Sequence, residues 1–215
     1  MPASKFILGL ALGQTCDFSA LAIVEVPPVS PGDGSYGRAA LSLPHLQRFS
    51  PGTHYLQIAD VLHDLLRTPA LAGSTLVVDQ TGVGQAVVAL VWNRLFNAVD
   101  ATLVPITLSS GHVTLRQGGG YLLPKQEMIG TLQVLLQTRR LHVARDLPDA
   151  PMFLRELETF RVHVTTAGSE SAEAWREGIN DDLVFAVGLA AWVAERYLFD
   201  ASRPEEPMIV YTWVP

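Results

Sequence analysis

Apolar residues gather in short continuous runs in the first part of the chain, and these runs have the length of strands. The sequence predicts strands over residues 6–12, 17–26 and 38–49, with a short turn at 13–16 and a Pro- and Gly-rich loop at 27–37. The first run is apolar at every position except Gly9, which is typical of a central strand covered on both faces. The short turn that follows predicts an antiparallel hairpin.

Helical spacing then alternates with further strand-like runs. Apolar residues recur three and four positions apart in residues 55–66, 85–98, 125–138, 150–160 and 180–197. Strands are predicted at 74–79, 101–107 and, briefly, 161–165, and residues 108–124 are expected to be a hairpin or flap around 118–120. We expect Thr53 and Asn180 to cap their helices, and Pro124 to take the first helical position.

This order predicts a single α/β domain over residues 1–215, in which residues 199–215 form a C-terminal arm. An antiparallel meander followed by strand–helix–strand units gives a mixed sheet, with parallel strands and helices on its faces. The chain has 215 residues, of which 48% are hydrophobic and 17% charged, so it can bury a core of that kind.

Composition narrows the possible functions. A net charge of -6 excludes a uniformly basic nucleic-acid coat but allows a local basic groove. The single cysteine, Cys16, excludes disulfide scaffolds and cysteine-type zinc sites. The apolar run at 183–194 is too short to cross a bilayer, which needs about 20 residues, so we expect no membrane partner and a reducing cytoplasm.

Carboxylates stand at two places where they could meet at one edge of the sheet. Asp79 ends a predicted buried strand, and Asp181 and Asp182 start a long helix. Converging carboxylates repel unless a cation neutralises them, and oxygen ligands favour Mg²⁺ or Mn²⁺. Two such ions about 4 Å apart support phosphodiester hydrolysis. Taken singly, each signal has a structural explanation: Asp79 as a turn residue, and the Asp pair as charges that complement the helix dipole.

Four stretches together resemble the C-terminal nuclease domain of bacteriophage large terminase subunits, and they follow the family's order. They read GLALGQTCDFSALA (residues 9–22), VVDQTGVG (77–84), PKQEMI (124–129) and WREGINDDLVFA (175–186). The resemblance implies an RNase H-like fold and an endonuclease that cuts concatemeric double-stranded DNA with Mg²⁺ or Mn²⁺. Carried over by position, it makes Asp79 and Asp182 metal ligands, with Asp181 beside them. It also implies an ATPase motor domain, a portal and a small terminase as partners in a full-length protein.

The chain departs from the family pattern at two positions. The family has Asp where this chain has Ala11, and that Asp would bridge both metals; the family has His where this chain has Asn180. Alanine has no side-chain oxygen, so we expect poor metal binding and slow or absent cleavage. A deliberate substitution and a natural loss both explain Ala11, and we favour the first because the flanking residues fit the pattern. Asp17 is a possible substitute ligand, although it lies beyond the turn.

Two further hypotheses remain beside the nuclease. The first is a naturally degenerate RNase H-like module that binds DNA without cutting it. The second is an actin-like or sugar-kinase-like ATP-binding domain, for which 215 residues are too few because such proteins need two related cores. No phosphate-binding loop of the G-x-x-x-x-G-K-[ST] type is present, so we expect an excised domain or a stand-alone nuclease. The candidate DNA contacts are Arg116, Lys125, Arg139, Arg140 and Arg176.

Overall fold

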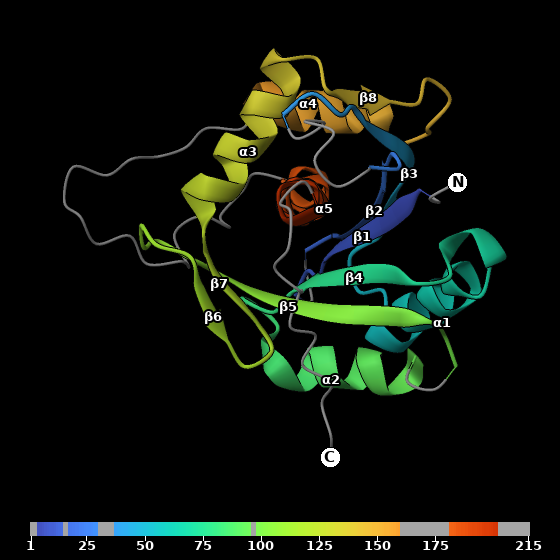
Figure 1. Cartoon of the computed structure of the whole chain (residues 1–215). Coiled ribbons are helices and arrows are strands. Elements are labelled where there is room, and N and C mark those ends of the chain that lie inside the picture. Colours follow the sequence, from blue (N-terminus) through green and yellow to red (C-terminus); the bar gives the residue numbers. More distant parts are fainter. Residues whose placement is uncertain (1–3, 15–16, 30–36, 96–97, 160–180, 202–215) are drawn as a thin grey trace.

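The computed structural model describes residues 4–14, 17–29, 37–95, 98–159 and 181–201 (Figure 1). The strands are β1 (Lys5–Ala11), β2 (Ser19–Val26), β3 (Leu41–Phe49), β4 (Ser74–Asp79), β5 (Ala101–Ser109), β6 (Leu115–Gln117), β7 (Gly120–Pro124) and β8 (Leu141–Val143). The helices are α1 (Tyr55–Leu66), α2 (Gly84–Leu95), α3 (Lys125–Gln137), α4 (Ala150–Thr159) and α5 (Asp182–Ala201), with a one-turn 3-10 helix at Pro69–Leu71.

One mixed sheet organises these elements, in the order β6-β7-β5-β4-β1-β2-β3-β8. Strand β2 is antiparallel to β1 and β3, and β6 is antiparallel to β7, whereas the other neighbouring pairs are parallel. Strands β1, β3, β4, β5 and β7 therefore all end at the same edge of the sheet, which we call the carboxyl edge.

Helices cover the sheet on both faces, as Figure 1 shows. On one face α5 packs against β1 and β2, and α3 and α4 pack against α5. On the other face α1 and α2 pack together and bury the alternate side chains of β1 and β4. Because β1 and β4 have a covered face on either side, they read as continuous apolar runs in the sequence.

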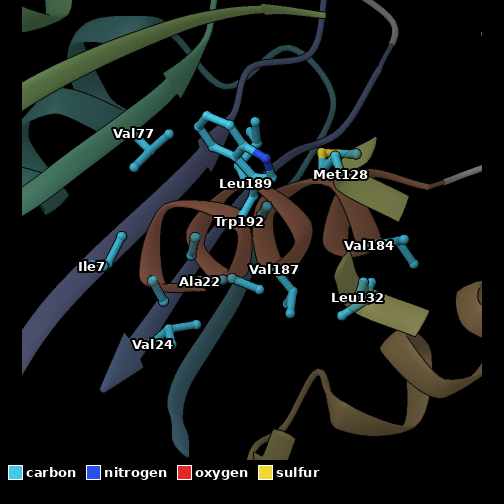
Figure 2. Close-up of a cluster of buried hydrophobic side chains, with 14 of the residues drawn as sticks. Ile7, Ala22, Val24, Val77, Met128, Leu132, Val184, Val187, Leu189 and Trp192 are labelled. Carbon is cyan, nitrogen blue, oxygen red and sulfur yellow. The ribbon is translucent and has the colours of Figure 1, made fainter. Parts of the chain in front are cut away.

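Helix α5 crosses β1 at a distance that only glycine allows. A Cβ atom at Gly9 would lie 2.0 Å from the carbonyl oxygen of Ala186 and 3.0 Å from the amide nitrogen of Ala190. Figure 2 shows the packing around this crossing, where side chains of β1, β2 and β4 meet those of α5 and α3. The helix runs opposite to β1, because the Lys5 ammonium at the start of β1 lies 5.9 Å from the ring centroid of Tyr197, near the end of α5. Helix α5 therefore begins at the carboxyl edge.

Most predicted elements are confirmed, and the mixed α/β sheet is the predicted fold class. The predicted hairpin at 108–124 is the β6–β7 pair, in which Gly118 and Gly119 form the turn with φ of 55° and 78°. Strand β8 was not predicted, because three residues directly after a helix carry no periodic signal. Thr53 was wrong as a cap: the cap of α1 is His54, whose backbone N–H donates to Gln57 Oε1 at 3.2 Å.

Two other predictions differ from the structure by a few residues at the ends of helices. Pro124 is the residue that caps α3 and not its first helical residue. Helix α5 continues to Ala201, so the first three residues of the predicted arm are helical. The Asn180 cap, the strand at 161–165 and the remainder of the arm lie outside the described residues. Among the described helices, none is both long and apolar enough to cross a membrane.

The close crossing at Gly9 predicts a large cost for one added methyl group. Gly9→Ala is expected to lower the free energy of unfolding by roughly 3 kcal/mol, because the Cβ meets backbone atoms of α5 that have no rotamer to change. The matched control is Gly130→Ala in α3, where nothing lies within 4 Å of the added Cβ, and which should be neutral or stabilising by up to about 1 kcal/mol. Urea unfolding measures both, and equal stability of the two variants would contradict the crossing.

Candidate active site

A row of paired residues crosses the sheet at its carboxyl edge. Residues paired directly across neighbouring strands point to the same face. The row consists of Arg48, Ala20, Ala11, Asp79, Ile106 and Tyr121. Ala11, Ala20 and Ile106 belong to the core beneath α5, so the whole row faces α5. Asp79 therefore lies one strand away from Ala11, about 4.8 Å between their Cα atoms.

Asp79 is held in one orientation by the turn that follows β4. Its Oδ1 accepts hydrogen bonds from the backbone N–H of Thr81, at 2.8 Å, and from the Thr81 hydroxyl. The Thr81 hydroxyl oxygen accepts in turn from the N–H of Leu108, at 2.7 Å, which ties the turn to β5. The carboxyl group is buried, with the residue 6% exposed. Asp79 is thus both a turn residue and a carboxylate fixed at the carboxyl edge.

Asp182 is the first residue of α5, and Arg48 contacts it from the end of β3. Arg48 Nη2 lies 3.3 Å from Asp182 Oδ2 and 3.1 Å from Glu156 Oε1. Glu156, in α4, also accepts the N–H groups of Leu183 and Val184 with its Oε2, at 3.0 and 3.3 Å. Since the first N–H groups of a helix have no partner within it, Glu156 stabilises the start of α5.

Burial dominates the electrostatics of this cluster. It raises the pKa of Glu156 from 4.5 to about 7, although Arg48 and the backbone N–H groups of α5 favour the ionised form. Burial also raises the pKa of Asp182, against the hydrogen bond and charge of Arg48, and the nearby Asp17 carboxylate raises it further. Both pKa values are raised because the loss of hydration on burial outweighs the stabilisation that Arg48 gives to the ionised carboxylates.

The other predicted site residues lie at different distances from the row. Asp181 directly precedes α5, and its carbonyl accepts the N–H of Phe185 at 2.9 Å. Asp17 lies just before β2 and acts on Asp182 through its charge. Lys125 starts α3 at the carboxyl edge, with its ammonium 4.4 Å from the ring centroid of Phe185.

The predicted DNA contacts separate into different groups. Arg116 is exposed on β6, with its guanidinium 5.7 Å from the ring centroid of Tyr121. Arg139 follows the last turn of α3, at the end of that helix away from the carboxyl edge. Arg140 differs from these residues, because its guanidinium is buried in a bidentate pair with Glu195, at 2.6 and 3.0 Å, and its Nε donates to Ala39 O. Arg176 lies outside the described residues.

Sequence reasoning missed Arg48 and Glu156. Arg48 could have been found from the register of the predicted hairpins, which places it level with Ala11 across β2. Glu156 lies three residues after the buried Phe153 on the inner stripe of α4, where an unpaired carboxylate would be costly. A glutamate at that spacing on an amphipathic helix is the signal that points to a buried partner.

Comparison with solved structures places this geometry in a known fold. The chain aligns with the large terminase nuclease of the thermophilic phage G20c with a TM-score of 0.56 and 21% identity, over 88% of this chain and 82% of that one. It aligns with the Mn-bound nuclease domain of the large terminase of bacteriophage SPP1 with a TM-score of 0.50 and 12% identity, over 86% and 84%. The chain has the RNase H-like fold of these nuclease domains.

Two further results limit what this structural similarity implies. A large terminase from another thermophilic bacteriophage aligns with a TM-score of 0.53 and 10% identity over 92% of this chain, but over only 40% of its own length. No family model matches the sequence, and a search of curated proteins found no match. The comparisons therefore establish the RNase H-like fold, and the activity has to be argued from the residues of this chain.

The residues present do not fit a two-metal site. Ala11 contributes a methyl group at the centre of the row, Asp79 Oδ1 is bound to Thr81, and Asp182 Oδ2 is bound to Arg48. Within the described part of the chain, no three His, Cys, Asp or Glu side chains group so that they could hold a metal ion. Of the three acidic positions that the family resemblance implies, the described residues carry Asp79 and Asp182, and Ala11 stands at the third.

The raised pKa of Glu156 predicts a stability that falls with pH. The folded protein keeps the Glu156 proton between pH 4.5 and about 7, whereas the unfolded chain releases it. Since the unfolded state binds fewer protons, the free energy of unfolding should decrease across this window by roughly 1–3 kcal/mol relative to Glu156→Gln. Urea unfolding of both chains at pH 4.5, 6 and 8 measures the difference. Parallel pH curves, or a relative gain for Glu156 on raising the pH, would contradict the shift.

Proposed function

We propose that the chain is the nuclease domain of a phage DNA-packaging terminase, acting on double-stranded DNA in the host cytoplasm, in which Ala11 has removed the activity. The observation that carries this proposal is the register of Ala11 with Asp79 on one side and with Ala20 and Arg48 on the other. A carboxylate at position 11 would stand in the row beside Asp79, on the face from which α5 presents Asp182. Three carboxylates from three elements would then converge, as hard divalent cations require.

The family resemblance and the fold support the same proposal from independent sides. Asp79, Lys125 and Asp182 belong to three of the motif stretches and are far apart in the chain. The fold brings all three residues to the same edge of the sheet. With Asp at position 11, that carboxylate and those of Asp79 and Asp182 would hold the divalent ions, which would supply the Lewis-acid chemistry of phosphodiester hydrolysis. In a full-length terminase, the ATPase motor domain, portal and small terminase would be the partners of this domain.

A naturally degenerate DNA-binding module is the alternative, and one observation favours it. Arg48 forms an ion pair with Asp182, so the negative charge of this carboxylate is already balanced by a side chain of the protein. A chain that has adapted to the loss of Asp at position 11 is expected to bind DNA but to stay inactive when that Asp is returned.

Returning the missing carboxylate should create nuclease activity. Ala11→Asp is expected to nick plasmid DNA in Mn²⁺ or Mg²⁺ at least about tenfold faster than the chain with Ala11, because even indirect changes at metal sites alter activity by about 10–100-fold. Ala11→Asn, which has the same shape without the charge, is the matched control and should stay inactive. Adding Asp79→Asn to Ala11→Asp should abolish the activity. Full nicking by that double variant would remove Asp79 from the site.

Lys125 is expected to contact a DNA phosphate, since it starts α3 at the carboxyl edge. Lys125→Gln should weaken duplex binding uniformly across sequences and lower the slope of log affinity against log salt by about 1. The control is Arg94→Gln, an exposed residue of α2 on the opposite face of the sheet, which should leave the slope unchanged. Fluorescence anisotropy at several salt concentrations measures both. The same slope for the original chain and Lys125→Gln would contradict this contact.

A further inference from the structure

Arg48 is buried and fixed from several sides at the carboxyl edge. Its side chain is 9% exposed, and its guanidinium carbon lies 3.8 Å from the centroid of the Phe18 ring. Its own backbone N–H donates to Asp149 Oδ2 at 2.8 Å, so the strand end is tied to the start of α4. These contacts hold the guanidinium beside the two carboxyl groups of Glu156 and Asp182.

Arg48 supplies a positive charge to the carboxyl groups of Glu156 and Asp182. An arginine stays protonated in proteins, so Arg48 brings one permanent positive charge to two buried carboxyl groups. Buried carboxylates need a positive partner, and where several of them meet that partner is commonly a divalent ion. In this chain the central row position is an alanine and the positive charge comes from a side chain.

We propose that Arg48 is the resident cation of the carboxyl edge: it holds Asp182 when no divalent ion is bound, and it competes with such an ion for that carboxylate. The assignment of Asp182 as a metal ligand rests on the proposed function, whereas the Arg48 contacts do not. Arg48 thus keeps the start of α5 anchored without metal, through Asp182 and through Glu156, which accepts the first N–H groups of the helix. It also weakens the affinity of the site for divalent cations.

Mn²⁺ binding, measured by electron paramagnetic resonance at pH 8, tests this competition. The four chains compared are the original sequence, Arg48→Gln, Ala11→Asp, and Ala11→Asp with Arg48→Gln. Loss of Arg48 should tighten Mn²⁺ binding in each pair, by on the order of tenfold with Asp at position 11, because a nearby positive charge is removed. Arg48→Lys, which keeps the charge, should bind Mn²⁺ as the original chain does. Arg94→Gln removes a charge from the other face and should have no effect.

The outcomes separate this proposal from the proposed function. Mn²⁺ binding that Arg48→Gln leaves unchanged or weakens would overturn the role of Arg48, while binding by Ala11→Asp would still support the metal site. Binding by the Arg48→Gln chains without any gain from Ala11→Asp would support Arg48 and overturn the role of position 11. No binding by any of the four chains would overturn both.

A second variant guards against loss of folding. Arg48→Gln leaves Glu156 and Asp182 without their partner, and breaking a buried ion pair on one side is strongly destabilising. Arg48→Gln with Glu156→Gln removes both charges together and keeps an acceptor for the N–H groups of α5. The double variant should keep the circular dichroism spectrum of the original chain and show the same gain in Mn²⁺ affinity. A folded double variant without that gain would overturn the proposal.

Discussion

The rest of the candidate site depends on the close contact between α5 and β1 at Gly9. With a side chain at this position the helix would have to move away from the sheet, because the Cβ would fall on backbone atoms of Ala186. One turn before Ala186 stands Asp182, and two residues after Gly9 stands Ala11. The same contact that closes the core therefore sets how near the start of the helix comes to the end of the central strand.

Near that contact, the positive charge of Arg48 is paired with the carboxyl groups of Glu156 and Asp182. Glu156 and Asp182 are brought together by the packing of α4 and α5, and burial alone would disfavour their ionised forms. Arg48 reaches them from the far side of β2, and Glu156 gains two helix N–H groups as further partners. The carboxyl groups of Glu156 and Asp182 are thus kept in place by an ion-pair network that spans β3, α4 and α5.

The sequence was sufficient for the elements whose patterns are local. Continuous apolar runs predicted β1 and β4, helical spacing predicted α1 to the residue, and the Asp79 turn was recognised from its strand and glycines. The partners of Arg48 and Glu156 and the pairing of β8 could not be identified from the sequence, because these contacts join segments about 100 residues apart. The pairing of Arg140 with Glu195 of α5 has the same character, because the two residues are 55 positions apart in the sequence.

The central claim is that position 11 completes a metal site with Asp79 and Asp182. The most direct test is a crystal structure of the Ala11→Asp chain grown with Mn²⁺, with the metal located by anomalous scattering. The account predicts an anomalous peak in contact with the carboxylates of positions 11, 79 and 182, with Arg48 displaced from Asp182. A peak elsewhere, or none at saturating Mn²⁺, would contradict it.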